Sequence, residues 1–349
     1  MTMETTFYDK RDASPALKAL YERLGRKNTA PLWEVLGEIV TPLPRSRCVP
    51  AHWKYDEVRA LLIEAGDLIS AQQAERRVLV LENPGLHAPQ ITPTLFAGVQ
   101  LVMPGETAPT HRHSASALRF VLESGEGAYT AVDGERTTMH AGDFILTPSW
   151  TYHDHGNPSE APAIWLDGLD IPIVNMFSAS FAEHHPDETQ PVTRPEGDAL
   201  TRYGGALMPV DFTPGRRSPL LSYPYARSRD ALDRLARNGP VHPTHGIKMQ
   251  YVNPATGGYP MPTIAAFLQL LPSGIETAEY RSTDATVFCV AEGRGTSRVG
   301  EQAFTWGPRD VFVVPSWQPV THLPQGDAVL FSFSDRPAQK ALGLWREQI

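Results

Sequence analysis

The stretch from Gln100 to Asp170 decides the fold: QLVMPGETAPTHRHSASALRFVLESGEGAYTAVDGERTTMHAGDFILTPSWTYHDHGNPSEAPAIWLDGLD. Short apolar runs alternate here with glycine-containing turns, a pattern typical of a compact β-barrel. The stretch contains two His-x-His pairs, one beginning at His111 and the other at His153. Because residues two apart on a strand point to the same face, each pair directs both imidazoles to one side of its strand.

The predicted metal ligands are His111, His113 and His153. Imidazole binds Fe, Cu, Zn and Ni, and three histidines also form catalytic zinc sites, so the ligand set does not choose between Zn and Fe. No carboxylate follows His113 closely, so a site of two histidines and one carboxylate is not indicated. Three neutral imidazoles leave a divalent ion its full charge, which favours an anionic chelating substrate such as a 2-hydroxybenzoate.

Several other polar side chains share the predicted inward face. His155 has the parity of His153 and is interpreted as a substrate contact; a fourth ligand, an outer hydrogen-bond donor and a solvated loop histidine are the alternatives. Arg119 lies in the apolar strand ALRFVLE, where an inward guanidinium needs an anion. That anion is a substrate carboxylate, Asp167, or both. Gln100 would offer its amide to the same pocket.

Two further positions bear on the pocket. Phe96 shares the parity of Gln100 on the preceding strand and is predicted to line the cavity. Arg76 and Arg77 open the first strand of the barrel. Either one of the two faces the pocket, or both are exposed.

The second half of the chain repeats the first. ITPTLFAGVQLVMPGETA (91–108) is echoed by PMPTIAAFLQLLPSGIETA (260–278), and Gln100 matches Gln269 at an offset of 169. DFILTPSW (143–150) is echoed by DVFVVPSW (310–317) at an offset of 167. A nearly constant offset in two separate segments indicates a duplication. We therefore expect two similar small β-barrels.

The second repeat lacks the predicted metal ligands. Alignment of the two Glu-Thr-Ala segments places Arg281 and Thr283 at the positions of the first His-x-His pair. Alignment of the two Pro-Ser-Trp segments places Val320 at the position of His153. The sequence therefore predicts metal binding in the first barrel alone.

The segment before the first barrel has helical patterns in ALKALYERL (16–24), Leu32–Ile39 and Tyr55–Ala65, the last ended by Gly66. Its predicted role is packing or oligomer formation. The 184–245 segment is polar and rich in proline, with a short helix around Asp230–Arg237. The predicted domains are a helical arm (1–75), the metal-binding barrel (76–183), a linker with a short helix (184–245) and a second barrel without metal ligands (246–349).

Composition limits the possible partners. The chain has 349 residues, 41% of them hydrophobic, and a formal net charge of −8, so nucleic acid and anionic membrane are not expected partners. Cys48 and Cys289 are the only two cysteines and do not suggest a disulfide framework, which favours a reducing cytoplasm. No apolar signal core opens the sequence, and no apolar run approaches the roughly 20 residues that span a bilayer.

The sequence resembles the gentisate 1,2-dioxygenase family of bicupins, which includes salicylate and 1-hydroxy-2-naphthoate dioxygenases. The resemblance covers nearly the whole chain. Its motifs are PLWEVLGEIVTPLP (31–44), AERRVLVLENPGL (74–86), the His-Arg-His barrel, WLDGLDIP (165–172) and YVNPATGGYPMPT (251–263).

This resemblance implies a mostly β bicupin fold with an N-terminal helical arm. It implies Fe(II) at the three histidines and O2-dependent cleavage between the carboxyl-bearing and the adjacent hydroxyl-bearing ring carbons, so that gentisate (2,5-dihydroxybenzoate) gives maleylpyruvate. It also implies a homo-oligomer, commonly a tetramer. The substrate-binding positions would be Arg76, Phe96, Gln100, Arg119 and His155, and the catalytic positions His155, Arg119 and Asp167.

The sequence departs from the family pattern at Phe96, where relatives commonly carry Tyr or Trp. Phenylalanine removes a polar group from the pocket, so salicylate, its 5-nitro or 5-chloro derivatives and 1-hydroxy-2-naphthoate are alternative substrates. A different class of function, either a non-oxidative metal-dependent isomerase or a ligand-binding cupin, would use the same barrel without O2.

Overall fold

The computed structural model describes residues 14–213, 215 and 217–349. The chain divides into two compact units, one ending at Arg45 and the other running from Ser46 to Ile349. The described part of the first unit contains α1 (Pro15–Gly25), capped by the Ser14 side chain, and α2 (Leu32–Ile39). Both helices were predicted. The predicted arm boundary at residue 75 is wrong, because residues 46–75 pack into the barrel unit.

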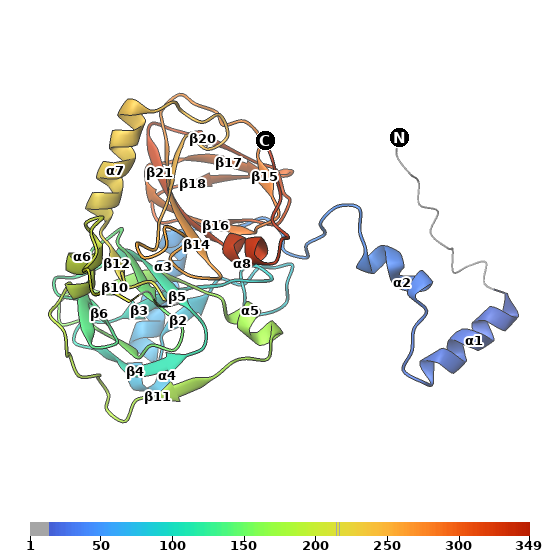
Figure 1. Cartoon of the computed structure of the whole chain (residues 1–349), viewed down its shortest axis with the longest axis horizontal. Coiled ribbons are helices and arrows are strands. Elements are labelled where there is room, and N and C mark those ends of the chain that lie inside the picture. Colours follow the sequence, from blue (N-terminus) through green and yellow to red (C-terminus); the bar gives the residue numbers. More distant parts are fainter. Residues whose placement is uncertain (1–13, 214, 216) are drawn as a thin grey trace. The chain divides into compact units, whose positions relative to one another are not determined.

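The second unit contains two barrels (Figure 1). The elements from the start of this unit to the end of the first barrel are β1 (Ala51–Trp53), α3 (Tyr55–Leu68), α4 (Ala71–Ala74), β2 (Val78–Val80), β3 (Phe96–Val102), β4 (Thr107–His113), β5 (Ala117–Glu123), β6 (Tyr129–Val132), β7 (Glu135–Thr138), β8 (Phe144–Thr147), β9 (His153–Gly156) and β10 (Ala163–Leu169). The connection to the second barrel contains α5 (Ile171–Met176), β11 (Ala182–His184), α6 (Asp198–Tyr203), β12 (Ser222–Tyr223) and α7 (Tyr225–Asn238).

The remaining elements are β13 (Ile247–Gln250), β14 (Ala265–Leu271), β15 (Arg281–Ser282), β16 (Thr286–Glu292), β17 (Gly295–Val299), β18 (Gln302–Trp306), β19 (Val311–Val314), β20 (Val320–Pro324), β21 (Ala328–Ser334), α8 (Arg336–Ala341) and β22 (Glu347–Gln348). The first barrel is built from the sheets β12-β8-β5-β10-β3-β2 and β11-β4-β9-β6-β7. The second is built from β1-β19-β16-β21-β14-β13, β18-β17-β20 and the pair β15-β22. The two predicted barrels are thus present, and the fold is mostly β.

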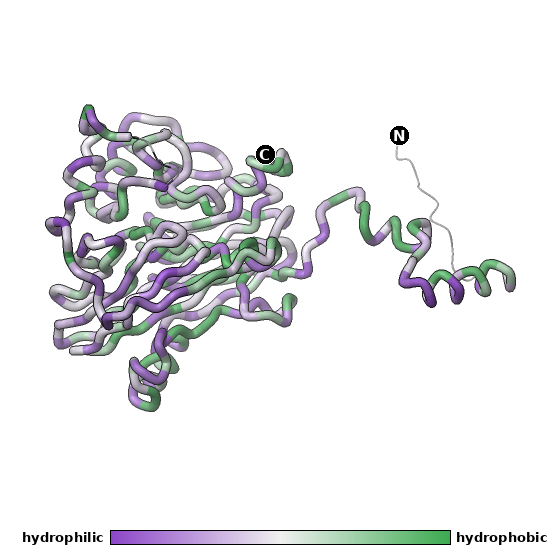
Figure 2. Tube along the Cα trace, turned by 60° about the horizontal axis from the view of Figure 1, so that its bottom comes forward, coloured by the Kyte–Doolittle hydropathy of each residue, from purple (hydrophilic) through white to green (hydrophobic). Residues whose placement is uncertain are grey.

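Strand alternation explains how the six-stranded sheet of the first barrel separates two cores. In β5, Leu118, Phe120 and Leu122 belong to a core shared with the second barrel. Val121 belongs to a different cluster, inside the first barrel. Because alternate strand residues face opposite sides, the strand that shields the shared core also presents Arg119 to the barrel interior. Figure 2 shows hydrophobic and hydrophilic residues interspersed along the strands.

The shared core joins the two barrels through aromatic side chains. Phe120 of β5 and Phe331 of β21 stack with ring centroids 4.2 Å apart, and Phe144 of β8 lies 5.6 Å from Phe331. All three rings are buried. Offset stacking adds to the large apolar area that each ring removes from water.

The duplication includes α3 and α7, each of which bridges the barrels at its N-terminus. The backbone N–H of Tyr55 donates to Asp310 of the second barrel, and that of Tyr225 donates to Asp143 of the first, both at 2.9 Å. The short strands before these helices also cross over, since β1 pairs with β19 and β12 pairs with β8. Segments that precede one barrel therefore complete the other.

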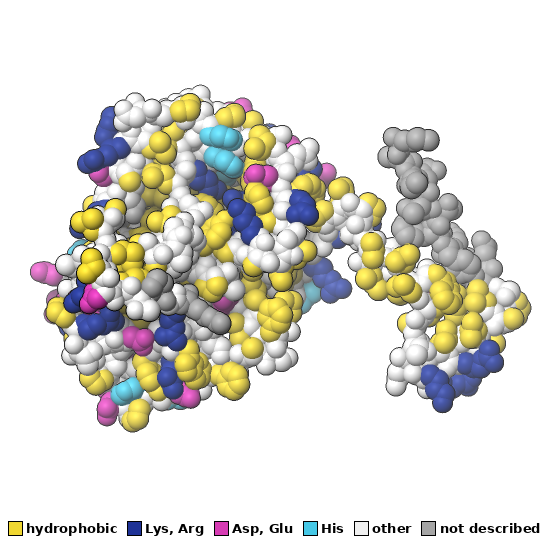
Figure 3. Space-filling model, viewed as in Figure 1, with side chains coloured by type: hydrophobic (Ala, Val, Ile, Leu, Met, Phe, Trp, Pro, Cys, Tyr) yellow, Lys and Arg dark blue, Asp and Glu magenta, His cyan; other side chains and the backbone are white. Residues whose placement is uncertain are grey.

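Two details of the predicted helices differ in the structure. The helix expected to end at Gly66 continues to Leu68. Gly66 does not end the helix but allows α3 to pack closely on β3, since a Cβ there would lie 3.1 Å from the Leu101 side chain. The described part of the linker contains two helices, whereas one was predicted, and α7 is longer than predicted. Among the described residues, no helix is long and apolar enough to cross a membrane, and on the face in Figure 3 basic and acidic side chains are interspersed.

We expect Phe331→Ala to lower the free energy of unfolding by about 3–5 kcal/mol, the usual cost of truncating a buried aromatic ring. The substitution opens a cavity between the two six-stranded sheets. Each sheet is held in place by its own barrel, so the sheets cannot move together to fill the cavity. Chemical denaturation followed by circular dichroism measures the change. Phe177→Ala is the control, because that side chain is 64% exposed, and its effect should stay within about 0.5 kcal/mol. Equal effects of the two substitutions would contradict a shared core.

Candidate active site

Three histidine side chains converge inside the first barrel. His111 and His113 lie on β4, and His153 opens β9, where it pairs directly with His111. One ring nitrogen from each histidine lies within 4.8 Å of the others. Among the described residues, this is the single group of His, Cys, Asp and Glu side chains with the spacing to hold a metal ion. The three predicted ligands are therefore brought together.

Backbone carbonyls fix the orientation of two of these rings. The Nδ1 of His113 lies 2.8 Å from the Ala115 carbonyl, and that of His153 lies 3.0 Å from the Thr151 carbonyl. A carbonyl oxygen only accepts, so both Nδ1 atoms carry the proton and both Nε2 lone pairs are left for a metal ion.

His111 is oriented differently, because the Arg76 guanidinium contacts its Nδ1. Arg76 also donates to the Pro109 carbonyl at 2.5 Å. A donor at Nδ1 places the ring proton on Nε2. Metal binding through Nε2 therefore requires Nδ1 to hold the proton and Arg76 to turn away, which frees the guanidinium for another anion or acceptor.

The protein environment keeps these imidazoles neutral, as metal ligation requires. Burial, followed by the charge of Arg76, lowers the pKa of His111 to about 2. Burial, followed by the charge of Arg119, lowers the pKa of His153 well below its ordinary value. Near neutral pH the site presents three uncharged nitrogen donors.

A cavity with about 190 Å³ of free space opens beside the three histidines. Of the residues predicted to surround the substrate, Arg76, Phe96, Gln100, Arg119 and Asp167 line it. Sequence reasoning missed the apolar part of the lining: Val78, Ala117, Leu169 and Ile171. Val78 could have been predicted, because it lies two residues after Arg76 on the first strand and therefore faces the same side.

The structure distinguishes the two adjacent arginines. Arg77 forms a 2.7 Å ion pair with Glu106 and donates to the Ile69 carbonyl, so it is a structural residue. Arg76 lines the cavity and has no carboxylate within ion-pair distance among the described residues. Burial, followed by the charge of Arg119, lowers the pKa of Arg76 to about 10, which still leaves it charged at neutral pH.

Arg119 already has an internal partner. Its Nε lies 3.6 Å from Asp167, which stands directly opposite it on β10 and also accepts from Trp165 Nε1 at 2.9 Å. Burial raises the pKa of Asp167 to about 6, although Arg119 opposes this shift. Gln100 lies on the neighbouring strand and its Nε2 has no partner within the described chain. The cavity therefore keeps a free amide donor and an excess of positive charge.

His155 lies behind Arg119 and is not among the residues that line the cavity. Its Nε2 is 3.1 Å from Arg119 Nη2, and its Nδ1 is 3.0 Å from Thr130 Oγ1. Burial is the main cause that lowers its pKa far below the ordinary value. In this structure, His155 therefore reaches the cavity only through Arg119.

The register of the second barrel corrects the predicted alignment of the repeats. Tyr280 pairs with Val320 in the way that His111 pairs with His153. The Ser282 carbonyl accepts from Trp317, as the carbonyl of the second β4 histidine accepts from Trp150. Tyr280 and Ser282 therefore occupy the two β4 ligand positions.

The predicted counterparts Arg281 and Thr283 are each one residue out of place. The error came from matching the Glu-Thr-Ala letters, which do not follow the structural register. Val320 stands where predicted, and none of the corrected counterparts supplies an imidazole.

Comparison with known proteins agrees with this geometry. A model described as "Cupin domain" matches residues 98–169. The chain is 54% identical to "Gentisate 1,2 dioxygenase 1" of Aquipseudomonas alcaligenes over 98% of this chain and 99% of that protein. It is 40% identical to "5-aminosalicylate 1,2-dioxygenase" of Comamonas sp, over 95% of this chain and 90% of that protein.

A solved structure shows the same fold over the full length. Salicylate 1,2-dioxygenase from Pseudoaminobacter salicylatoxidans, solved as an adduct with gentisate, superposes with a TM-score of 0.92 at 36% identity, and the match covers 100% of this chain and 97% of that chain. The chain therefore belongs to the gentisate 1,2-dioxygenase family of ring-cleaving cupin dioxygenases.

Proposed function

We propose that the protein is an Fe(II)-dependent gentisate 1,2-dioxygenase. The bond between the carboxyl-bearing carbon and the adjacent hydroxyl-bearing carbon of gentisate breaks, both atoms of O2 enter the product, and maleylpyruvate forms. The proposal rests on three neutral imidazoles that meet, in one cavity, the Arg76 guanidinium, which has no carboxylate partner among the described residues. Such a cavity suits a dianionic chelate of carboxylate and phenolate.

The donor set fits Fe(II), which would be held by His111, His113 and His153. Zinc also binds imidazole ligands, but it has no redox chemistry. The similar proteins are dioxygenases by name, and that reaction favours a redox-active metal such as iron. When bound, the iron would supply the path by which electrons move from the ring to oxygen. Three protein ligands would leave coordination positions for a bidentate substrate and O2.

The chain's own residues would bind and orient the ring. Arg76, turned away from His111, would pair with the substrate carboxylate as a charge-assisted contact. Gln100 would donate its free Nε2–H to the same group. Arg119 would contact the carboxylate from the other side, held in place by Asp167. Fixing the ring in this way supplies much of the rate advantage, because it replaces an encounter in solution by a bound geometry.

His155 is the proposed proton-handling residue. When Arg119 turns towards the carboxylate, the Nε2 of His155 becomes available to the phenolic oxygen. In its neutral state this Nε2 would accept a hydrogen bond from the phenolic hydroxyl, and the negative charge of the bound substrate would raise the proton affinity that burial lowers. Thr130 beside its Nδ1 fixes the ring.

Ring preference depends on Phe96, which lines the cavity. Its ring contributes no hydrogen-bonding group to a polar substituent. The 5-hydroxyl of gentisate makes the ring electron-rich, so gentisate is the proposed main substrate. Salicylate, 5-nitro- and 5-chlorosalicylate and 1-hydroxy-2-naphthoate are the alternatives for the same reaction.

We also propose that the protein is a cytoplasmic homotetramer. Both cysteines are free and buried, which is compatible with a reducing compartment. The segment 32–43 exposes large apolar side chains, among them Trp33 and Ile39. Such a surface supports self-association through the N-terminal arm.

The metal prediction is one iron per chain after anaerobic reconstitution, measured by elemental analysis. The double variant His111→Ala/His113→Ala should keep less than about a tenth of that iron, since two of the three ligands are gone. His140→Ala is the control, because that imidazole is 77% exposed at the surface of the same barrel. Near-stoichiometric iron in the double variant would place the metal elsewhere.

The activity prediction is oxygen uptake equal to gentisate consumed, with maleylpyruvate appearing as the ring absorbance disappears. An oxygen electrode and a spectrophotometer follow both. Side-by-side kcat/KM values for gentisate, salicylate and 5-substituted salicylates rank the substrates. Turnover under strict anaerobiosis would instead favour a non-oxidative isomerase, and binding without turnover would favour a ligand-binding cupin.

Replacement of either cavity arginine should reduce kcat/KM for gentisate. We expect Arg76→Met and Arg119→Ala each to cost about 2–5 kcal/mol in transition-state binding, the range for truncating one partner of a buried charge pair. Steady-state kinetics at matched iron content measures this cost. Only Arg119→Ala should also lower stability, because it leaves the Asp167 carboxylate buried without its partner.

Arg112→Ala is the matched control for both arginines. Arg112 lies on β4 between two metal ligands but pairs with Glu183 outside the barrel, so kcat/KM should change little. Near-wild-type efficiency of Arg76→Met would show that this guanidinium does not anchor the substrate.

A further inference from the structure

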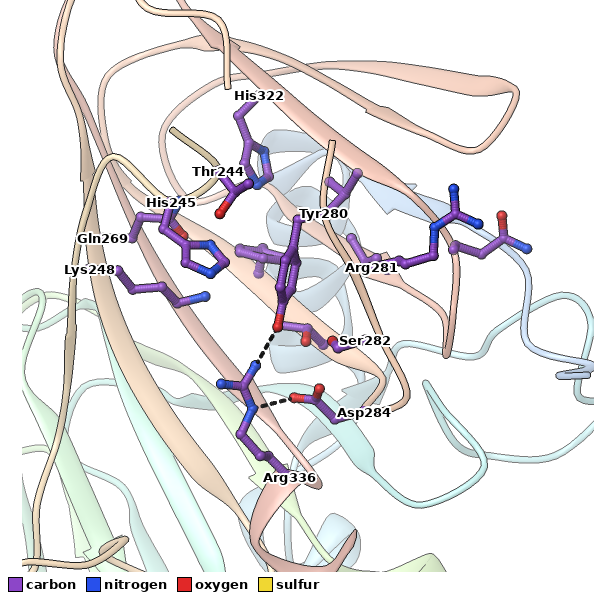
Figure 4. A pocket seen from close by; sticks show the side chains of 15 residues that line it. Thr244, His245, Lys248, Gln269, Tyr280, Arg281, Ser282, Asp284, His322 and Arg336 are labelled. Atoms are coloured by element: carbon purple, nitrogen blue, oxygen red, sulfur yellow. Dashed lines mark hydrogen bonds and ion pairs between the residues drawn. The ribbon is translucent and has the colours of Figure 1, made fainter. Parts of the chain in front are cut away.

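The interior of the second barrel holds a smaller cavity than that of the first. Its free space is about 20 Å³, enough for one or two water-sized atoms. Figure 4 shows the polar side chains that surround it, drawn from several strands and from α8. They include Lys248, Gln269, Tyr280, Asp284, His322 and Arg336.

Gln269 is a buried amide without partners. It is 1% exposed, and neither its Nε2 nor its Oε1 has a hydrogen-bond partner within the described chain. Gln269 is the counterpart of Gln100, whose Nε2 is likewise unpartnered in the substrate cavity. A buried polar group left unsatisfied is destabilising, so both amides point to a molecule bound beside them.

His322 is the counterpart of His155. It lies opposite Thr277 as His155 lies opposite Ala108, and its Nδ1 is 2.7 Å from Ser297 Oγ. That Oγ also accepts from Trp306 Nε1 at 2.9 Å, and among the described residues Nδ1 is the acceptor within reach of the Ser297 hydroxyl, so we assign the hydroxyl proton to this contact. The imidazole then carries its own proton on Nε2, and His322 becomes a second N–H donor for the cavity that it lines.

Lys248 supplies the charge. It stands opposite Gln269 in the β13–β14 register, where the first barrel has Val78 opposite Gln100. Among the described residues, Lys248 forms no hydrogen bond or ion pair; its Nζ lies 4.9 Å from the centre of the Phe267 ring. The side chain is half-buried, and an ammonium held partly out of water without an anion is destabilised.

The other charges around the cavity already balance. Arg336 Nε lies 3.0 Å from Asp284, which also accepts from Ser334 and Trp345. The nearby Arg281 pairs with Glu279. Lys248 is therefore the cation of this cavity that has no carboxylate of its own.

We propose that the second barrel binds one small monovalent anion, of the size of chloride or formate, between Lys248, Gln269 and His322. The three side chains provide one positive charge and two N–H donors. The limited free space excludes an aromatic carboxylate such as the substrate of the first barrel. The second barrel thus has the Gln and the His of the first barrel's pocket, lacks its metal ligands and binds an anion through a lysine instead.

Protonation supports this assignment. Burial, followed by the charge of Arg336, lowers the pKa of Lys248 to about 7, and a bound anion would raise it. Burial, followed by the charge of Lys248, lowers the pKa of His322 to about 3, so this side chain stays a neutral donor. Anion affinity should therefore weaken as the pH rises above about 7. The other titratable groups facing the site are His245, Tyr280, Arg281, Asp284 and Arg336.

Crystals of the iron-loaded protein soaked in bromide provide the direct test. We expect an anomalous peak within hydrogen-bond distance of Lys248 Nζ and Gln269 Nε2 in the wild type. The peak should be absent from Lys248→Met. It should persist in Lys340→Met, the control, since Lys340 is an exposed lysine of the same barrel.

A thermal shift in solution tests the same site without a crystal. Formate replaces the bulky anion gluconate at constant ionic strength, and Tm should rise along a saturating curve in the wild type, because a ligand that binds only the folded state stabilises it. The rise should be lost in Lys248→Met and, should that variant fail to fold, in Gln269→Leu. Chloride in place of formate separates inorganic from carboxylate anions.

Two outcomes would overturn the proposal. One is the absence of a bromide peak together with equal Tm responses of wild type and variants. The other is displacement of the bromide peak by gentisate or salicylate, which would reveal an aromatic-acid site in its place. The test is independent of the proposed activity, because none of its readouts is turnover.

Discussion

The apolar contact between the two six-stranded sheets is the constraint on which the rest of the molecule depends. One core cluster contains the outward residues of both sheets, and Phe120 stacks on Phe331 across it. Once one face of each strand is committed to this contact, strand alternation commits the other face to a barrel interior. For this reason Arg119, which stands between Leu118 and Phe120 of the shared core in the sequence, faces the interior of the first barrel.

The same constraint explains why elements cross between the barrels. β1 and β12 each extend the sheet of the opposite barrel, and α3 and α7 begin on carboxylates of the opposite barrel. Each crossing protects a sheet edge that would otherwise expose unpaired backbone groups. The two halves therefore form one folding unit, although they arose from one repeat.

The sequence predicts most of this architecture because its signals are local or periodic. The His-x-His pairs, the strand parity of Arg119 and the two echoes at nearly constant offset each led to the observed structure. The boundary at residue 75 failed because a helical pattern does not reveal that α3 packs on β3. The counterparts of the β4 histidines were misplaced by one residue because the alignment matched identical residues, whereas the strand pairing in the two barrels is shifted by one residue relative to that match. The contact of Arg76 with His111 joins distant segments and leaves no local pattern.

The difference between the two barrel interiors comes from a few aligned positions. Opposite Asp167 the first barrel has Gly98 and Arg119; opposite Ser332 the second has Phe267 and Phe288. A Cβ at Gly98 would lie 2.4 Å from the Val78 side chain, so the first barrel keeps its space only with glycine there. Two phenylalanines fill the corresponding space in the second and place their rings beside Lys248. A barrel with room for an aromatic acid needs charge at its walls, whereas a barrel filled by aromatic rings has room only for a small ion.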